Sequence, residues 1–299
     1  MTSTPGTTTP GTTTPGTTTP GTTTPGTTTP GTTTSGTTPT GTTTAPPSAS
    51  PGGLATGFLD AAMALLARVR EEEAGSIAAA GALLADTAAS GGRLFAFGAG
   101  HSSLPAQDLV YRAGGLALMN LLAGPGLVGV DVRPATLGSA LERVEGYATA
   151  VLDSSPLRAG DALVIISLSG RNALPVEMAQ AARARGVRVI GVTSVAYAEG
   201  TTARNPSGTF LKDHCDVVLD NKIAVGDAEL SVEGIGAPFA PASTVVTSAV
   251  LQAVMASAAG ALLERGVEPP MLRSGNVDGG HAWNAEVFAT YRDRIFYQH

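Results

Sequence analysis

Residues 162–172, Ala-Leu-Val-Ile-Ile-Ser-Leu-Ser-Gly-Arg-Asn, decide the fold of this chain. The apolar run 162–166 is typical of a parallel strand that is buried on both faces. A helix is expected over residues 176–185. The polar stretch 167–172 therefore lies where a helix N-terminus presents N–H groups without intrahelical partners and a positive partial charge. The stretch predicts a binding site for a phosphate or another oxyanion.

Strands and helices alternate along most of the chain. Strands are expected over residues 93–98, 116–122, 161–167, 187–193 and 216–220, and helices over 58–69, 77–87, 102–113, 140–152, 176–185, 241–265 and 283–294. Such alternation predicts an α/β protein with a five-stranded parallel sheet covered by helices on both faces. Ligands of these sheets bind beyond the carboxyl ends of the strands, where the strand order reverses.

Residues 1–53 differ in composition from the rest of the chain. They repeat Thr-Thr-Thr-Pro-Gly, and the first charged residue is Asp60. With almost no apolar side chains to bury, we expect this segment to be a disordered low-complexity tail. An O-glycosylated stalk is the alternative, and the absence of a secretion signal disfavours it. Residues 54–299 are enough for one domain with a closed core.

Composition excludes several classes of function. The formal net charge is −6 and no basic stripe is visible, which argues against a nucleic-acid partner. Cys215 is the only cysteine, which favours a reducing compartment. Four scattered histidines show no metal-ligand spacing, and no long apolar run predicts a membrane span. We expect a cytoplasmic protein without a metal, cofactor or membrane partner.

A second polar loop, residues 98–103 (Gly-Ala-Gly-His-Ser-Ser), follows the first strand. Its glycines permit a tight turn, and its serines add hydroxyl donors. A dinucleotide site is disfavoured because Ser103 replaces the third glycine of the fingerprint, and the second strand ends without an acidic residue for a ribose. Either loop alone fits an ordinary strand-to-helix turn. Two such loops, after strands one and three, are harder to explain that way.

The pair of loops resembles the SIS (sugar isomerase) family. The resemblance rests on Gly98-x-Gly100-x-Ser102, on Ser167-x-Ser169-Gly170-x-Asn172, and on Pro241-Ala-Ser-Thr244 at the start of a long helix. An uncharacterised bacterial SIS group is more similar still, in residues 98–102, 111–115, 172–179 and 276–280. The resemblance covers residues 54–299.

The resemblance implies a three-layer αβα sandwich that binds a phosphorylated sugar and pairs as a homodimer. The residues that it assigns to the ligand are Gly98, Gly100, Ser102, Ser103, Ser167, Ser169, Gly170, Asn172, Ser243 and Thr244. Many SIS isomerases have Thr or Ser at the position of Asn172.

Three residues are candidates for acid–base chemistry. Aldose–ketose isomerisation needs a base that moves a proton between C1 and C2, and donors that stabilise the enediolate. His101 lies inside the first loop, where a structural role is the alternative. Glu177 either faces the site or interacts with the N-terminal dipole of its helix. Glu233 resembles, in rough position, an acidic residue of SIS isomerases.

The most direct interpretation is a phosphosugar isomerase. Two alternatives remain: a phosphosugar sensor without catalysis, and a lyase or etherase acting on an N-acetylmuramic-type phosphosugar. SIS sensors usually carry a DNA-binding domain, which the Thr-Pro-Gly repeat cannot supply.

Overall fold

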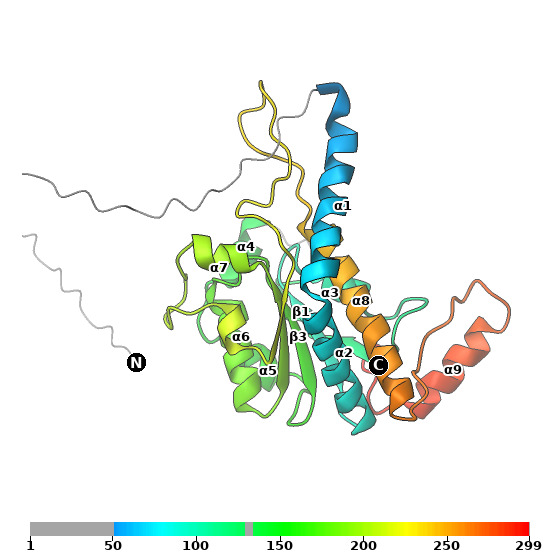
Figure 1. Ribbon diagram of the computed structural model, residues 1–299. Helices are drawn as coiled ribbons and strands as arrows, with labels where there is room; N and C mark the ends of the chain where they lie inside the picture. The colour runs from blue at the N-terminus through cyan, green and yellow to red at the C-terminus, as the bar shows by residue number, and fades with distance from the viewer. Residues whose placement is uncertain (1–50, 129–133, 299) are drawn as a thin grey trace, which may run out of the picture. The chain divides into compact units, whose positions relative to one another are not determined.

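The computed structural model describes residues 51–128 and 134–298. Most of the tail expected over residues 1–53 lies outside these ranges, and its last three residues form a short 3-10 helix, η1 (Pro51–Gly53). From Leu54 onward the chain forms the alternating elements that the sequence predicts (Figure 1).

The centre of the fold is a five-stranded parallel sheet, which confirms the predicted class. The strands are β1 (Leu94–Gly98), β2 (Met119–Leu121), β3 (Ala162–Ile166), β4 (Arg188–Thr193) and β5 (Val217–Asp220), in the order β2-β1-β3-β4-β5. The order reverses between β1 and β3, and the last residues of these strands, Gly98 and Ile166, are paired. The two predicted loops therefore begin side by side.

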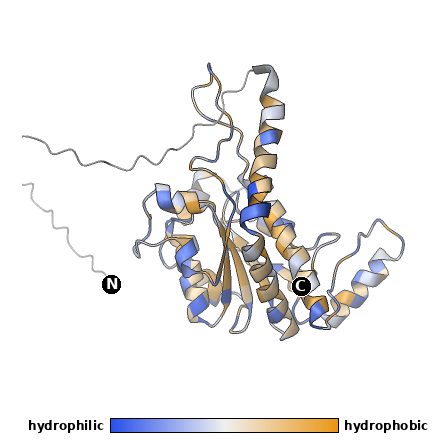
Figure 2. Cartoon of the chain, viewed as in Figure 1, coloured by the Kyte–Doolittle hydropathy of each residue, from blue (hydrophilic) through white to orange (hydrophobic). Residues whose placement is uncertain are grey.

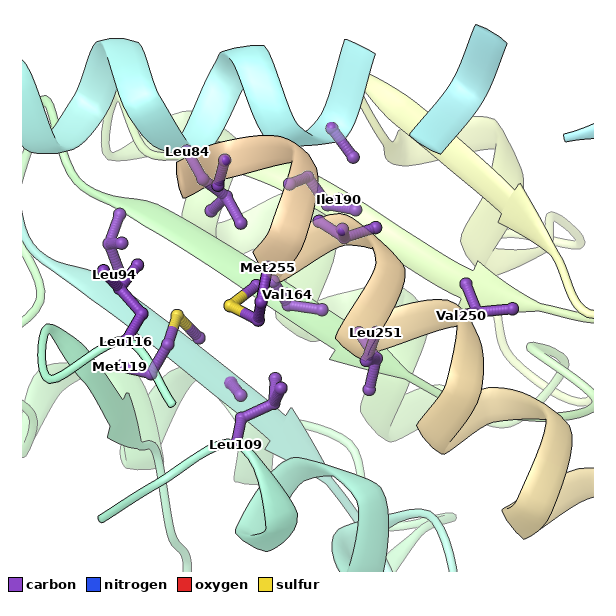
Figure 3. Close-up of a cluster of buried hydrophobic side chains, with 14 of the residues drawn as sticks. Leu84, Leu94, Leu109, Leu116, Met119, Val164, Ile190, Val250, Leu251 and Met255 are labelled. Atoms are coloured by element: carbon purple, nitrogen blue, oxygen red, sulfur yellow. The ribbon is translucent and has the colours of Figure 1, made fainter. Parts of the chain in front are cut away.

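Helices cover both faces of the sheet. One face carries α1 (Leu54–Glu72), α2 (Ala74–Ala89), α3 (Ser103–Asp108) and α8 (Ser243–Glu264), and the other carries α5 (Tyr147–Asp153) and α6 (Ala173–Ala184). Strand side chains alternate between two cores, with Leu94 and Val164 in the first and Phe95 and Leu163 in the second. Figure 3 shows the first core between α2, α8 and the sheet, and Figure 2 shows how apolar the strands are.

Two predicted helices differ from the structure. The helix expected over 102–113 ends with α3 at Asp108, and Tyr111 and Gly114 then adopt positive φ angles that a helix does not allow. The helix expected over 140–152 is two short helices, α4 (Thr136–Leu141) and α5, because Gly146 is left-handed (φ 79°). No helix was predicted for the residues that form α7 (Val195–Gly200) after β4.

The remaining elements are η2 (Leu211–His214) and α9 (Gly280–Thr290). The central helix α8 is long and apolar enough, by length and composition alone, to cross a membrane. It packs against α1, α2 and α3, and Val246, Val250 and Val254 along it are buried in the first core. These contacts are those of a core helix.

Candidate functional site

A cavity of about 290 Å³ opens at the carboxyl ends of β1 and β3. Its lining comprises Phe97, Ala99, His101, Ser102, Glu142, Ile166, Ser167, Leu168, Ser169, Pro175 and Tyr197. Four of the sequence-predicted site residues, His101, Ser102, Ser167 and Ser169, thus share one cavity. We call this cavity the first chamber.

The loop between β3 and α6 is a tight turn. The backbone N–H of Gly170 donates to Ser167 Oγ (3.3 Å). Gly170 has a φ of 57°, and a Cβ at this position would come within 2.9 Å of Thr193 Oγ1, so glycine is required there. Within the described part of the chain, the backbone N–H groups of Ser169 and Arg171 have no acceptor. They are free to bind an anion at the start of α6.

The loop after β1 divides into residues that shape the turn and residues that face the cavity. A Cβ on Gly98 would lie 2.1 Å from the carbonyl oxygen of Ser102, and Gly100 has a φ of 54°. Ser103 is fully buried, and its Oγ donates to the carbonyl of Gly100 (2.7 Å). His101 and Ser102 line the chamber. Gly98, Gly100 and Ser103, predicted as ligand-binding residues, therefore form the turn that presents the other two.

Glu142, at the end of α4, is a site residue that the sequence analysis missed. Its Oε2 accepts from Asn172 Nδ2 (2.8 Å), and its main-chain carbonyl accepts from the N–H of Leu174 (3.0 Å). A Cβ built on Gly100 would lie 3.8 Å from Glu142 Oε1. The carboxylate therefore lies between the two loops and lines the first chamber. Residues 140–152 were expected to form one helix, and nothing in that pattern singles Glu142 out.

The structure places Glu177 and Glu233 away from the first chamber. Both carboxylate oxygens of Glu177 accept from the N–H of Gly146, at 2.9 and 3.0 Å. Glu177 therefore interacts with the N-terminus of α5, a neighbouring helix. Glu233 is exposed in the segment between β5 and α8 and lines neither this chamber nor the one beside it.

The predicted residues Ser243 and Thr244, in the first turn of α8, line a second chamber of about 300 Å³. The remaining lining residues are His101, Ser102, Pro105, Ile166, Leu168, Asp227, Pro241 and Thr247. Four of them, His101, Ser102, Ile166 and Leu168, also line the first chamber. The two chambers therefore adjoin at the ends of β1 and β3.

The described residues contain no group of three or more His, Cys, Asp or Glu side chains that could hold a metal ion. The polar groups of both chambers are hydroxyls, carboxylates and one imidazole, and no Lys or Arg is among their lining residues. Hydrogen bonding and proton transfer are the chemistry that these groups offer.

Comparison with known proteins places this architecture in a family. Residues 57–194 match the model of the SIS domain. Over 241 residues, 81% of this chain and 96% of the relative, the sequence is 77% identical to a UPF0309 protein of Streptomyces coelicolor. This chain belongs to the UPF0309 family. A UPF0309 protein of Oceanobacillus iheyensis is 39% identical over 229 residues, 77% of this chain and 93% of that protein. The predicted relationship to a bacterial SIS group is confirmed.

Solved structures similar to this UPF0309 protein include the phosphoheptose isomerase GmhA of Neisseria gonorrhoeae, with 18% identity and a TM-score of 0.45 over 70% of this chain and 96% of that one. The NanR protein of Vibrio vulnificus, solved in complex with ManNAc-6P, has 14% identity and a TM-score of 0.44 over 72% of this chain and 68% of that one.

Proposed function

We propose that this protein is a cytoplasmic, homodimeric enzyme that binds a sugar phosphate in the first chamber and interconverts its aldose and ketose forms. One observation carries the proposal. Ser167 and Ser169 line the chamber beside the start of α6, and His101 and Glu142 line the same chamber. An anion-binding loop and two groups for acid–base chemistry therefore share one cavity of about 290 Å³.

The phosphate is assigned to residues 167–172. Ser167 and Ser169 supply hydroxyls, and the N–H groups of Ser169 and Arg171 are unpaired within the described residues. The twelve-residue helix α6 directs its positive end toward the same loop. Since no Lys or Arg lines the chamber, hydrogen bonds from hydroxyls and backbone N–H groups are what we expect to hold the phosphate.

Glu142 is our candidate for the base that moves the proton between C1 and C2. Its carboxylate lines the chamber, while that of Glu177 is held by Gly146 and Glu233 is exposed outside it. The amide of Asn172 orients Glu142 from the phosphate loop, which fixes the base relative to the phosphate. His101, on the opposite loop, is placed to protonate the sugar oxygen during ring opening.

Dimerisation is proposed from the apolar surface around α1. Leu59 and Met63 on this helix are each 59% exposed. Beside them, an apolar groove of about 400 Å³ runs between α1, α2 and α8. A second copy of the chain would cover this surface. Light scattering on the purified protein tests whether it is a dimer. The double variant Leu59→Glu with Met63→Glu is expected to be a monomer.

Thermal shifts across a panel of sugar phosphates test binding. We expect at least one to raise the unfolding temperature of the full-length protein, and Ser167→Ala with Ser169→Ala to abolish the shift. Ser154→Ala is the matched control, because Ser154 bonds to the carbonyl of Ala150 at the end of α5, outside both chambers. An unchanged shift in unfolding temperature in the double variant would contradict the assignment of the phosphate to residues 167–172.

Deuterium exchange from solvent into the bound sugar separates an isomerase from a sensor. An isomerase introduces deuterium at C1 or C2 through the enediolate, and Glu142→Gln is expected to slow the exchange by about 100-fold or more while the sugar still binds. Binding without any exchange would identify a sensor. Loss of a substituent from the sugar would identify a lyase or etherase.

A further inference from the structure

The second chamber extends the site away from the phosphate loop. It shares four lining residues with the first chamber, and each chamber is close to the lower limit of about 300 Å³ for small-molecule sites. Ser167 and Ser169 line only the first chamber, and Asp227, Ser243 and Thr244 line only the second. The second chamber therefore adjoins the cavity to which the phosphate is assigned.

A helix begins at each chamber, and the two helices differ in the hydrogen bonding of the N–H groups near their first residues. The turn before α6 leaves the N–H groups of Ser169 and Arg171 without an acceptor within the described chain. At the start of α8, Asp227 is bonded to two N–H groups and one hydroxyl. Its Oδ1 accepts from the N–H of Ala242 (3.2 Å) and of Ser243 (3.0 Å), and its Oδ2 accepts from Ser243 Oγ (2.6 Å).

Like the first chamber, which Glu142 lines, the second chamber has a carboxylate and no Lys or Arg among its lining residues. The carboxylate of the second chamber is that of Asp227. Burial raises the pKa of Glu229, and the nearby charge of Asp227 raises it further. Glu229 therefore lies close enough to Asp227 to sense its charge. A second anion entering this chamber would meet the carboxylate of Asp227, which already accepts from the N–H groups of Ala242 and Ser243.

We propose that the second chamber is a subsite for the uncharged, hydroxyl-bearing end of the ligand, and that Asp227 makes the protein select sugar monophosphates over sugars with a second anionic group. The inference rests on the proposed function, because it needs the phosphate in the first chamber. A carboxylate has about four acceptor positions, and Asp227 uses three of them internally. The fourth is free for a sugar hydroxyl, while like-charge repulsion by Asp227 disfavours a phosphate or carboxylate group beside it.

Isothermal titration calorimetry of the full-length protein with fructose 6-phosphate and with fructose 1,6-bisphosphate tests whether the protein selects the monophosphate. These probes differ only in the second phosphate. We expect the wild type to bind the monophosphate at least tenfold more tightly than the bisphosphate. Asp227→Asn keeps the size of the side chain but removes its charge, and it is expected to reduce this ratio several-fold.

Thr244→Asp provides a second variant with the opposite prediction. Thr244 lines the second chamber in the first turn of α8, where an added carboxylate is compatible with the helix dipole. It is expected to increase the ratio further. If Asp227→Asn does not fold, the wild-type ratio and its change in Thr244→Asp still decide the question.

The outcomes separate the two proposals. Monophosphate binding that is lost in Ser167→Ala with Ser169→Ala, combined with equal binding of the bisphosphate by the wild type, overturns the selection by Asp227 alone. If neither Asp227→Asn nor Thr244→Asp changes the ratio of monophosphate to bisphosphate affinity, selection by Asp227 is also overturned. Absence of binding by every sugar monophosphate of the thermal-shift panel, or binding that is insensitive to the two serine substitutions, overturns the proposed function and this inference with it.

Discussion

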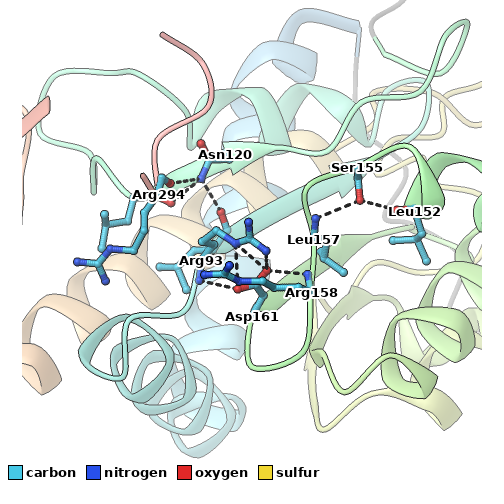
Figure 4. A network of polar contacts seen from close by, with 10 residues as sticks. Arg93, Asn120, Leu152, Ser155, Leu157, Arg158, Asp161 and Arg294 are labelled. Carbon is cyan, nitrogen blue, oxygen red and sulfur yellow. Dashed lines mark hydrogen bonds and ion pairs between the residues drawn. The ribbon is translucent and has the colours of Figure 1, made fainter. Parts of the chain in front are cut away.

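The polar groups at the amino end of the parallel sheet and those at its carboxyl end differ in whether they have hydrogen-bond partners within the protein. At the amino end, Asp161 and Arg93 form a buried ion pair whose side chains are 1% and 7% exposed (Figure 4). Asp161 also accepts from the backbone N–H groups of Arg93 and Arg158, both at 2.9 Å. At the carboxyl end, Ser169 and Arg171 keep N–H groups without an acceptor in the described chain. Polar groups are paired internally where they stabilise the sheet and left unpaired where a ligand is expected.

The largest effect is expected from Asp161→Ala. The substitution leaves the guanidinium of Arg93 buried without its partner, and breaking such a pair costs about 3–5 kcal/mol of stability. Urea unfolding measures this loss. Asp86→Ala is the matched control, because its ion pair with Arg265 is half exposed and is expected to contribute less than about 1 kcal/mol. Equal losses in the two variants would contradict the difference between buried and exposed pairs.

Asn120→Ala tests the amino end a second time, with a smaller expected effect. Asn120 is 1% exposed; its amide donates to the carbonyls of Leu94 (3.2 Å), Leu118 (3.0 Å) and Arg294 (2.9 Å), and its Oδ1 accepts from the N–H of Phe296 (2.7 Å). Loss of these partners leaves buried groups unpaired, at a cost of about 1–3 kcal/mol in the free energy of unfolding.

Asn284→Ala is the control for that variant. Its side chain makes two bonds of 2.8 Å to the backbone of Arg273, but at an exposed position where water replaces them. We expect it to destabilise the protein less than Asn120→Ala does in the same urea titration. Equal destabilisation would show that burial of Asn120 contributes nothing.

The sequence predicted the five strands and both loops because each signal is local. An apolar run such as 162–166 identifies a buried strand, and the polar residues that follow it mark the end of that strand. Glu142 and Asp227 were missed because their places in the site depend on distant contacts. Glu142 follows the last residue of α4 and contacts Asn172, which lies 30 residues away in the sequence. Asp227 contacts the start of α8 across an irregular segment that contains the Leu230–Phe239 bridge.

Glu142→Gln tests the carboxyl end, where stability is expected to change little. Glutamine retains an oxygen that accepts from Asn172, and Glu142 is only partly buried, so we expect a change below about 1 kcal/mol in the free energy of unfolding. The same variant is expected to lose proton exchange at the sugar. A destabilisation as large as that of Asp161→Ala would show that both ends of the sheet serve stability.

The smallest effect is expected from the pH dependence of His214, which lies in η2. Its Nε2 lies 3.1 Å from the amide nitrogen of Gln180 and 2.7 Å from Thr209 Oγ1. Burial lowers the pKa of His214 below its ordinary value of 6.5. Below pH 6.5 the unfolded chain therefore binds more protons than the folded one, and stability falls as the pH decreases. His214→Gln has no group that titrates there. Urea unfolding of both proteins between about pH 7.5 and 5.5 is expected to show a steeper decrease in the free energy of unfolding for the wild type. Equal decreases in the two proteins would mean that protonation of His214 does not destabilise the folded state.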